Sequence, residues 1–296
     1  MQVEEIVAQL EINTRTFPRL ALEAAIEQRE AITPILISTL DKLSENLEQL
    51  LEKEDYILHI HALYLLAQFR EPLAYPVIIK FFSVPGEAAL DVTGDIVTED
   101  LCRILASVSS EDIEPIKQLI ENRKVNEYIR GAALEALLVL VAQGVISKEE
   151  VIQYYAKLYS AFTQEEGDYL WTELVSSSAQ LSASELKEEM DKAFKQDLID
   201  PFFLDEEDVN DDLQLGTEAA LSKLRENPRY SFIENVVSEM ENWSCFKSEQ
   251  VSQEDDSFLL PELLTLLAVT KKSKKKAKKK RKMQEQSRRR NRSKKK

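Results

Sequence analysis

The chain has 296 residues, of which 44% are hydrophobic, and this content excludes a generally disordered protein. Residues 271–296 hold 17 Lys or Arg and one acid, Glu285, so this stretch carries +16. Since the whole chain carries −15, the remainder carries −31. Such an acidic body with a basic tail is the strongest functional signal in the sequence.

Three features predict a cytoplasmic protein. The amino-terminal stretch MQVEEIVAQL is acidic and lacks the basic-then-apolar order of a signal peptide. No apolar run approaches the roughly 18 residues of a membrane span. Cys102 and Cys245 are too few and too far apart for a disulfide framework or a zinc site, and they fit a reducing compartment.

Apolar residues at helical spacing predict a series of short helices. An amphipathic opener, Val3–Leu10, comes first. Five antiparallel pairs are then expected, namely Phe17–Glu30 with Thr33–Leu51, Tyr56–Phe69 with Ala74–Phe82, Asp95–Ser109 with Ile113–Asn122, Asn126–Gln143 with Ser147–Phe162, and Asp168–Leu181 with Ser184–Leu198. Two later helices are predicted near Leu213–Glu226 and over Phe232–Trp243.

The pairs recur with a period near 40 residues. Pro34 aligns with Pro76 at a shift of 42, and Pro115 aligns with Pro76 at a shift of 39. Each proline is expected to open the second helix of its pair, where its missing N–H would be unpaired anyway. This period is typical of HEAT or armadillo arrays. We therefore predict an all-α, HEAT-like α–α superhelix (solenoid) with a disordered polybasic C-terminal tail; the alternative is an irregular helical bundle.

Helix starts and boundaries can also be proposed. Thr33 is a good N-cap, and the spacings Ser147–Glu150 and Ser182–Glu185 predict capping boxes. The acidic run at 205–212 lacks the glycine and terminal glutamate of a calcium loop, so a solvated loop is expected. The predicted domains are the solenoid at 1–243, an acidic linker with a short apolar segment at 244–270, and the tail at 271–296.

Three long segments resemble a bacterial family catalogued as domain of unknown function 1186. They are HIHALYLLAQFREPLAYPVI (59–78), GDIVTEDLCRILASV (94–108) and LWTELVSSSAQLSASELKEEMDKAFKQDLIDPFF (170–203), within a resemblance that covers about residues 5–240. The resemblance implies a HEAT-like helical repeat and no established activity. Members of that family often end in a cysteine-rich SEC-C zinc motif. This chain has no cysteine after Cys245, so that zinc site is not expected here.

A polar cluster at the start of a predicted helix supplies candidate groove contacts: Asp95, Thr98, Glu99, Asp100 and, one turn on from Glu99, Arg103. The simpler interpretation is that the first four cap the helix and favour its dipole. Arg130, which aligns with His59 across a 71-residue shift, is a further candidate, either as a brace to the adjacent repeat or as a ligand contact.

The two histidines, His59 and His61, stand two residues apart on a predicted helix and so point about 200° apart, which argues against one shared metal. One is expected in the packing between repeats and the other at the surface. Trp171 and the pair Tyr154 and Tyr155 are interpreted as core or inter-repeat contacts rather than ligand platforms. No metal or other cofactor is predicted.

The tail is the candidate polyanion-binding site. Its basic residues are Lys271, Lys272, Lys274, Lys275, Lys276, Lys278, Lys279, Lys280, Arg281, Lys282, Arg288, Arg289, Arg290, Arg292, Lys294, Lys295 and Lys296. Without aromatic residues the tail lacks base-stacking platforms and should not discriminate between sequences. The apolar segment Phe258–Val269 would either cap the solenoid or lie on a membrane surface beside the tail.

The sequence therefore favours a non-enzymatic interaction or scaffold protein. The solenoid would bind a protein partner, which no motif identifies, and the tail would bind RNA, the ribosome or DNA. A membrane-surface adaptor is the first alternative. An enzyme with an unrecognised site in the solenoid groove is the remote one, because the chain supplies no catalytic constellation. No pattern specifies an oligomeric state.

Overall fold

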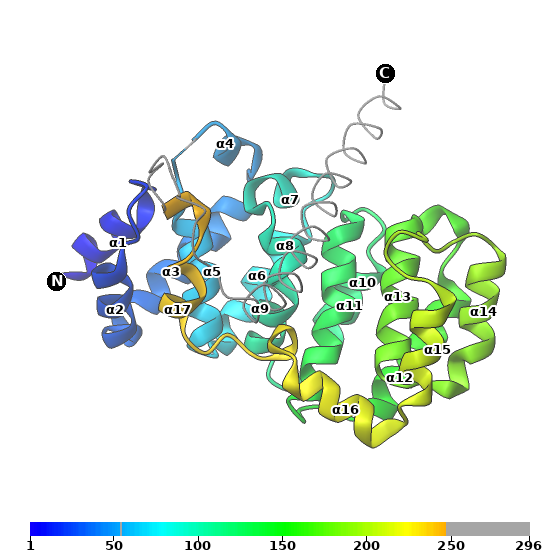
Figure 1. Ribbon diagram of the computed structural model, residues 1–296. Coiled ribbons are helices and arrows are strands. Elements are labelled where there is room, and N and C mark those ends of the chain that lie inside the picture. The colour runs from blue at the N-terminus through cyan, green and yellow to red at the C-terminus, as the bar shows by residue number, and fades with distance from the viewer. Residues whose placement is uncertain (54, 247–296) are drawn as a thin grey trace, which may run out of the picture. The chain divides into compact units, whose positions relative to one another are not determined.

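The computed structural model describes residues 1–53 and 55–246, which belong to one compact unit, Met1–Ser248 (Figure 1). In these ranges the regular structure is helical, without a strand, and backbone bridges occur as isolated pairs at Ile12–Tyr56 and Gly86–Val125. The predicted all-α solenoid is confirmed for this part of the chain. The apolar segment and the tail lie outside the described residues.

The α-helices are short. In chain order they are α1 (Val3–Glu11), α2 (Arg19–Glu27), α3 (Arg29–Ser44), α4 (Glu48–Leu51), α5 (Leu58–Gln68), α6 (Tyr75–Phe82), α7 (Ala88–Thr93), α8 (Ile96–Glu99), α9 (Leu101–Val108), α10 (Glu114–Glu121), α11 (Glu127–Ala142), α12 (Lys148–Ala161), α13 (Asp168–Gln180), α14 (Lys187–Lys195), α15 (Glu206–Gln214), α16 (Thr217–Glu226) and α17 (Val236–Met240). The 3-10 turns are η1 (Pro72–Ala74), η2 (Gln164–Glu166), η3 (Ser184–Leu186), η4 (Pro228–Tyr230) and η5 (Ser244–Phe246).

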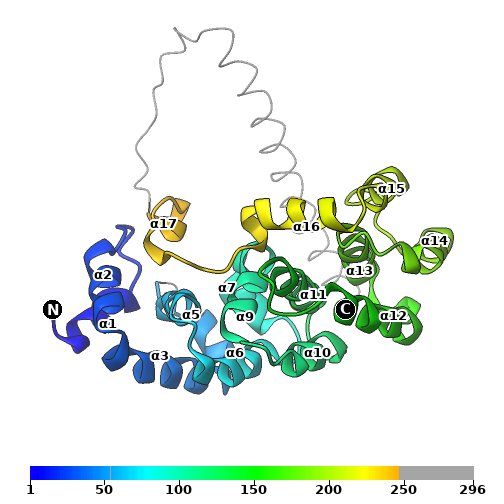
Figure 2. The ribbon, with the colours of Figure 1, turned by 90° about the horizontal axis from the view of Figure 1, so that it is seen from below.

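The helix pairs stack side by side in two layers. Figure 2 shows α3, α6, α10 and α12 in an outer row and α5, α9, α11 and α13 in an inner row. Successive inner helices pack on one another, and each also packs on outer helices of its own or a neighbouring pair. The five predicted pairs correspond to α2 with α3, α5 with α6, α9 with α10, α11 with α12, and α13 with α14.

The inner helices form the centre of the core. α5 is buried from Leu58 to Ala67, and α11 is buried from Ile129 to Ala142. A helix that is apolar on all sides must be covered on all sides, and here the neighbouring pairs and the outer row provide that cover. Leu66, in the middle of α5, is fully buried. Tyr155 is also fully buried and Trp171 is 6% exposed, which confirms the core interpretation of these aromatics.

Prolines open two of the three aligned helices. Pro76 and Pro115 stand in the first turn of α6 and α10, as predicted. The prediction for Pro34 is wrong, because α3 begins at Arg29 and contains this proline. The carbonyl of Gln28 already accepts from the amides of Ala31 and Ile32, so the helix starts a turn earlier. Thr33 is consequently not an N-cap.

Two further helix-start predictions have different outcomes. The Ser147 hydroxyl accepts from the amide of Glu150 at 3.1 Å, which is the N-cap half of the predicted capping box. Ser182 does not cap a helix: its φ is +50°, and its hydroxyl donates to the Leu213 carbonyl at 3.1 Å. A tertiary contact therefore replaces the local cap at this position.

The acidic run at 205–212 is helical rather than the predicted loop, since most of it lies in α15. The Asp205 carboxylate accepts from the amide of Asp208 at 2.9 Å and so caps this helix. Three acids follow in the first turn, where the helix dipole favours negative charge. A helix start and a solvated acidic loop have similar compositions, so the composition of this run does not distinguish between them.

The predicted helix over Phe232–Trp243 is mostly absent. Only α17 forms there, and it begins after Asn235, whose side chain accepts from the amides of Val237 and Ser238. Residues 231–235 are not helical. We call residues 205–246 the return segment, because after the last pair the chain runs back over the inner row (Figure 2). Along it, α15 packs on α13, α16 and η4 pack on α11, and α17 packs on α5 and α2.

Candidate functional site

The inner face of the solenoid, meaning the side of α5, α9, α11 and α13 that meets the return segment, carries the polar groups singled out in the sequence. The structure divides the candidate groove contacts. Thr98 and Arg103 take part in contacts with the return segment, Asp100 pairs with Arg103 and accepts from Tyr64 of α5, and the side chains of Asp95 and Glu99 are exposed. No side-chain cap bond forms at Asp95 or Asp100, so the capping interpretation is wrong for these two.

Arg103 is the centre of this polar network and is 7% exposed. Its guanidinium donates to Asp100 at 2.9 Å and to both carboxylate oxygens of Glu239, at 3.0 and 2.6 Å. It also donates to the carbonyls of Ser231 at 3.0 Å and Phe232 at 3.1 Å. Although burial acts to lower the pKa of Arg103, the hydrogen bond and charge of Glu239 raise it above its ordinary value. The group therefore stays charged and joins α9 to two parts of the return segment.

A second arginine makes the reciprocal contact, since Arg229 belongs to the return segment and its carboxylate partner belongs to the inner face. It forms a two-pronged pair with Glu135 of α11. Its remaining donors reach the Thr98 carbonyl at 3.1 Å and the Glu99 carbonyl at 3.3 Å. These carbonyls lie at the end of α8, where helical backbone acceptors lack partners. Thr98 and Glu99 thus contribute backbone rather than side-chain groups.

The stretch from Tyr230 to Val236 is held mainly through its backbone. Gln143 donates to the Tyr230 carbonyl at 2.9 Å, and the Ile233 amide donates to the Ser107 hydroxyl at 3.1 Å. The Val236 amide donates to Gln68 at 2.7 Å. The face therefore meets this stretch with side chains placed at or beside the ends of three inner helices: Gln68 at the end of α5, Arg103 and Ser107 in α9, and Gln143 just after α11.

Arg130 does not contact the return segment. Its Nε donates to the Ile120 carbonyl at 2.6 Å, and its Nη1 lies 2.7 Å from Glu166 of η2. Arg123 lies 2.7 Å from the same carboxylate. Arg130 therefore joins α10, α11 and the start of the next pair, which is a bracing geometry between repeats.

Both histidines are buried, so the expectation of one at the surface is wrong. His59 donates from Nε2 to the Val92 carbonyl at 2.9 Å, and His61 donates from Nδ1 to the Leu10 carbonyl at 2.7 Å. The rings thus reach towards α7 and α1 respectively. Burial lowers the pKa of both imidazoles to about 4, and the neutral rings act as hydrogen-bond donors in the packing.

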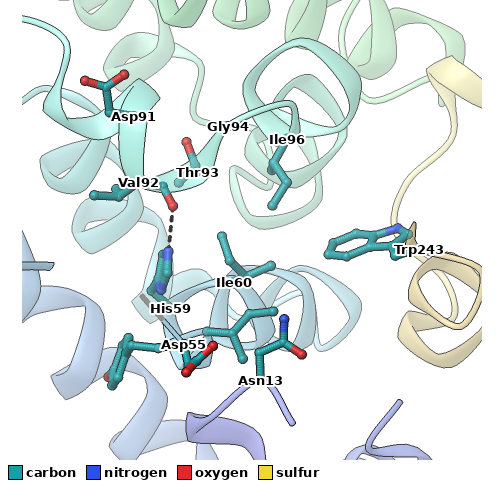
Figure 3. Close-up of a pocket in the computed structure, with 12 residues that line it drawn as sticks. Asn13, Asp55, His59, Ile60, Asp91, Val92, Thr93, Gly94, Ile96 and Trp243 are labelled. Atoms are coloured by element: carbon teal, nitrogen blue, oxygen red, sulfur yellow. Dashed lines mark hydrogen bonds between the residues drawn. The ribbon is translucent and has the colours of Figure 1, made fainter. Parts of the chain in front are cut away.

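A cavity of about 270 Å³ lies beside His59 (Figure 3). Ile60 of α5 and Ile96 of α8 line it, together with Asn13 and Asp55 from loops. Trp243 of the return segment lines its remaining side, and in Figure 3 the indole faces Ile60 and Ile96. Through Trp243 the return segment therefore lines part of this pocket as well as covering the inner helices.

The described residues also bear on metal binding and on membrane crossing. Across residues 1–53 and 55–246, no group of three or more His, Cys, Asp or Glu side chains is placed to hold a metal ion. In the same part of the chain, no helix has the length and apolar character needed to cross a membrane.

With this geometry established, the chain can be compared with known proteins. The family described as "Protein of unknown function (DUF1186)" matches residues 1–247. The chain belongs to this family. The DUF1186 match ends just after the last described residue, so it includes the return segment but not the basic tail.

Two similar curated proteins carry the description "Uncharacterized protein". A protein of Chlamydia trachomatis serovar D is 36% identical over 244 residues, which is 82% of this chain and 96% of the relative. A protein of Chlamydia muridarum is 36% identical over 244 residues, covering 82% of this chain and 97% of the relative. No solved structure matches the chain. The similarity therefore spans nearly the whole of each relative but leaves part of this DUF1186 chain unmatched.

Sequence reasoning missed the return segment as a partner of the inner face. Asn227, which precedes Pro228, and Asn235 were the available signals, because each caps the short turn or helix that follows it. A pattern of this kind breaks a helix into short pieces and favours extended chain between them.

Proposed function

We propose that this DUF1186 protein is a non-enzymatic cytoplasmic adaptor whose solenoid binds a protein partner and whose basic tail binds a polyanion. The observation that carries the proposal is the separation of charge, with +16 on residues 271–296 and −31 on the rest of the chain. Nucleic acid and the ribosome present dense phosphate charge, and the tail has the composition to bind it without reading sequence.

The acidic remainder of the chain, residues 1–270, opposes the binding of a polyanion to the tail. Because it carries −31, it repels a polyanion, and it also competes for the tail. Exposed charge pairs are individually weak and are screened beyond roughly 8–10 Å at physiological salt. A nucleic acid releases counterions when lysines bind, so it should displace the body from the tail.

The test is a salt series with fluorescence anisotropy on labelled single-stranded RNA and DNA. We compare the full chain, residues 1–270, a tail peptide, and a full-length variant in which every Lys and Arg of 271–296 is replaced by Gln. Binding by the full chain should fall about 10³–10⁵-fold between 50 and 200 mM salt if six to ten phosphates are contacted. Residues 1–270 and the Gln variant should not bind, and the free peptide should bind more tightly than the full chain at low salt.

Other outcomes would redirect the proposal. Retained RNA or DNA binding by residues 1–270 would place the polyanion site on the solenoid and contradict a tail site. Equal binding by peptide and full chain would remove the competition from the body. A preference for anionic vesicles, lost when Phe258 and Leu263 are both replaced by Ser, would favour the membrane-surface adaptor instead.

A further inference from the structure

We infer that the inner face is a binding site for an acidic peptide of another protein that is extended over a short stretch and then helical, and that the return segment is its built-in occupant. A partner segment of the same chemistry would displace residues 227–243 and take their place. This inference rests on the partner-binding half of the proposed function and names its surface, its ligand class and its means of regulation.

The first argument is the way in which the occupant is held. The amides of Ile233 and Val236 and the carbonyls of Tyr230, Ser231 and Phe232 are all bound by inner-face side chains. Backbone groups are common to every peptide, so a surface that binds them accepts any extended chain with suitable side chains. In this respect the site resembles other peptide-binding surfaces, in which main-chain hydrogen bonds give affinity and pockets give specificity.

The second argument concerns the apolar anchors, which set the side chains that a ligand must carry. Tyr230 is 4% exposed, while Ile233 and Val236 are fully buried. Between them, Glu234 and Asn235 are exposed. A ligand should therefore carry an aromatic residue followed at positions +3 and +6 by aliphatic residues, and the exposed positions need not be apolar.

Charge supplies the third argument. One carboxylate of the solenoid, Glu135, receives Arg229. Three arginines of the solenoid receive carboxylates of the return segment: Arg70 pairs with Glu234, Arg103 pairs with Glu239, and Arg19 pairs with Glu241. Arg70 also lies over the ring of Phe232, with its guanidinium carbon 3.9 Å from the ring centre. The preferred ligand thus begins with a basic residue and continues as an acidic chain, and these arginines disfavour the chain's own basic tail as an occupant.

Residues 231–235 of the occupant are not helical and present no continuous apolar helix face to the solenoid, so the buried apolar side chains of α17, namely Val236, Val237 and Met240, are those that a competing peptide must replace. Tethering raises the effective concentration of the occupant to about the millimolar range, so a free peptide competes only when it binds more tightly or when the tethered copy is weakened. Two of the four ion pairs, Arg19–Glu241 and Arg70–Glu234, are substantially exposed and are screened by salt, whereas Arg103–Glu239 and Arg229–Glu135 are mostly buried.

The experiment uses the full chain and a fluorescein-labelled peptide of residues 226–246, with Ser in place of Cys245. The double variant Arg229→Ala/Ile233→Asp weakens the occupant and leaves the receiving face unchanged. It should bind the peptide at least about tenfold more tightly than the wild-type chain does, because the tethered competitor is removed. A peptide carrying the same two substitutions is the matched control and should not bind.

A second measurement keeps the inference testable if the double variant fails to fold. Excess peptide with a uniform heavy-isotope label, whose fragments differ in mass from those of the chain, is added to the wild-type chain, and hydrogen exchange is followed by mass spectrometry over residues 227–240 of the chain. Displacement should speed exchange there and leave residues 127–142 of α11 protected. Unchanged exchange at millimolar peptide, together with no saturable binding to the double variant, would overturn the inference. So would a dimer of the wild-type chain in which the segments are exchanged and the peptide is excluded.

Polyanion binding is measured on the same samples and separates this inference from the function that it deepens. Loss of peptide binding with tail-dependent RNA binding retained would refute only the peptide site. Absence of RNA binding with peptide binding retained would refute only the tail. The two results depend on different residues, so neither can be mistaken for the other.

Discussion

The inner helices and the return segment lie against each other but are stabilised by different physical means. α11 is buried along fourteen consecutive residues, from Ile129 to Ala142, most of them apolar. The return segment between Arg229 and Glu241 instead depends on hydrogen bonds from its backbone, four ion pairs and a few apolar anchors. Apolar burial is not directional and scales with area, whereas polar contacts require partners at fixed positions. Apolar burial therefore stabilises a helix without fixing each partner atom, whereas the return segment depends on individual polar partners, which the inferred exchange of one peptide for another requires.

The largest effect should come from placing a charge among the inner helices. Leu66→Asp puts an unpaired carboxylate in a fully buried site, which costs several kcal/mol against a total stability of about 5–15 kcal/mol. We expect loss of the cooperative thermal transition, followed by circular dichroism. Leu73→Asp is the matched control, because Leu73 is 72% exposed and its replacement should change stability by less than about 0.5 kcal/mol. Similar melting of the two variants would contradict the burial of α5.

Substitutions in the contact between the inner helices and the return segment should cause the second largest loss of stability. Arg103→Met leaves Asp100 and Glu239 without their cation in a partly buried site, and breaking such a pair costs about 3–5 kcal/mol. Urea unfolding should report this loss, and hydrogen exchange should increase first over 231–240. Lys80→Ala removes an exposed pair with Asp41 and should cost about 0–1 kcal/mol. Exchange that increases equally in α11 would show that the two regions are not separable.

Acid should weaken the amino-terminal end of the contact, where the His61 ring stacks on Phe246 of the return segment. Burial lowers the pKa of His61 from 6.5 to about 4 in the folded chain. Between pH 6.5 and pH 4 the imidazole is therefore protonated more readily in the unfolded chain than in the folded one. The contribution of His61 is complete above pH 6.5 and is lost progressively as pH falls towards 4. At pH 5 the loss is roughly 2 kcal/mol, since each pH unit below 6.5 contributes about 1.36 kcal/mol.

The variant His61→Asn keeps a donor for the Leu10 carbonyl and does not titrate. Urea unfolding at pH 7 and pH 5 should show a smaller acid loss for this variant than for the wild type. The comparison is needed because Glu127 acts in the opposite direction. Burial, together with the charges of Asp168 and Glu87, raises the pKa of Glu127 to about 7, so its protonation stabilises the fold as pH falls from 7 towards 4.5. Equal acid losses in variant and wild type would refute the burial of a neutral His61.

The smallest effect tests the close approach of α11 and α13. A Cβ at Gly131 would lie 2.7 Å from Cε1 of Tyr169. Overpacking costs about 1–3 kcal/mol, and Ala is favoured over Gly in a helix by about 1 kcal/mol, so Gly131→Ala should destabilise by about 1 kcal/mol net. In a Tyr169→Leu background the same change should be neutral or stabilising. Equal costs in both backgrounds, measured by urea unfolding, would mean that the two helices do not meet at this point.

The paired helices could be predicted from the sequence because their determinants are local. Apolar spacing within α5 and α11, first-turn prolines at Pro76 and Pro115, and the Ser147 cap all act within a few residues. The inner-face network could not be predicted in the same way. Arg103 and Glu239 are 136 positions apart, and Arg229 and Glu135 are 94 positions apart. No periodicity in the sequence links residues so far apart. The helix predicted over Phe232–Trp243 was wrong for the same reason, because contacts with the solenoid, rather than local preference, determine the conformation of this stretch.

The return segment lies at the carboxy-terminal end of residues 1–247, which match the family, and this position has a consequence for how the chain folds during its synthesis on the ribosome. A chain is made from its amino terminus, and its early domains fold while later residues are still being added. The first four helix pairs are complete by Ala161, but Arg229 and Glu239 do not exist until many residues later. During that interval Arg103 lacks Glu239 and Glu135 lacks Arg229, although Arg103 already has its pair with Asp100. A newly made copy therefore passes through a period in which its inner face is open, before its own carboxy-terminal residues can compete with any other peptide nearby.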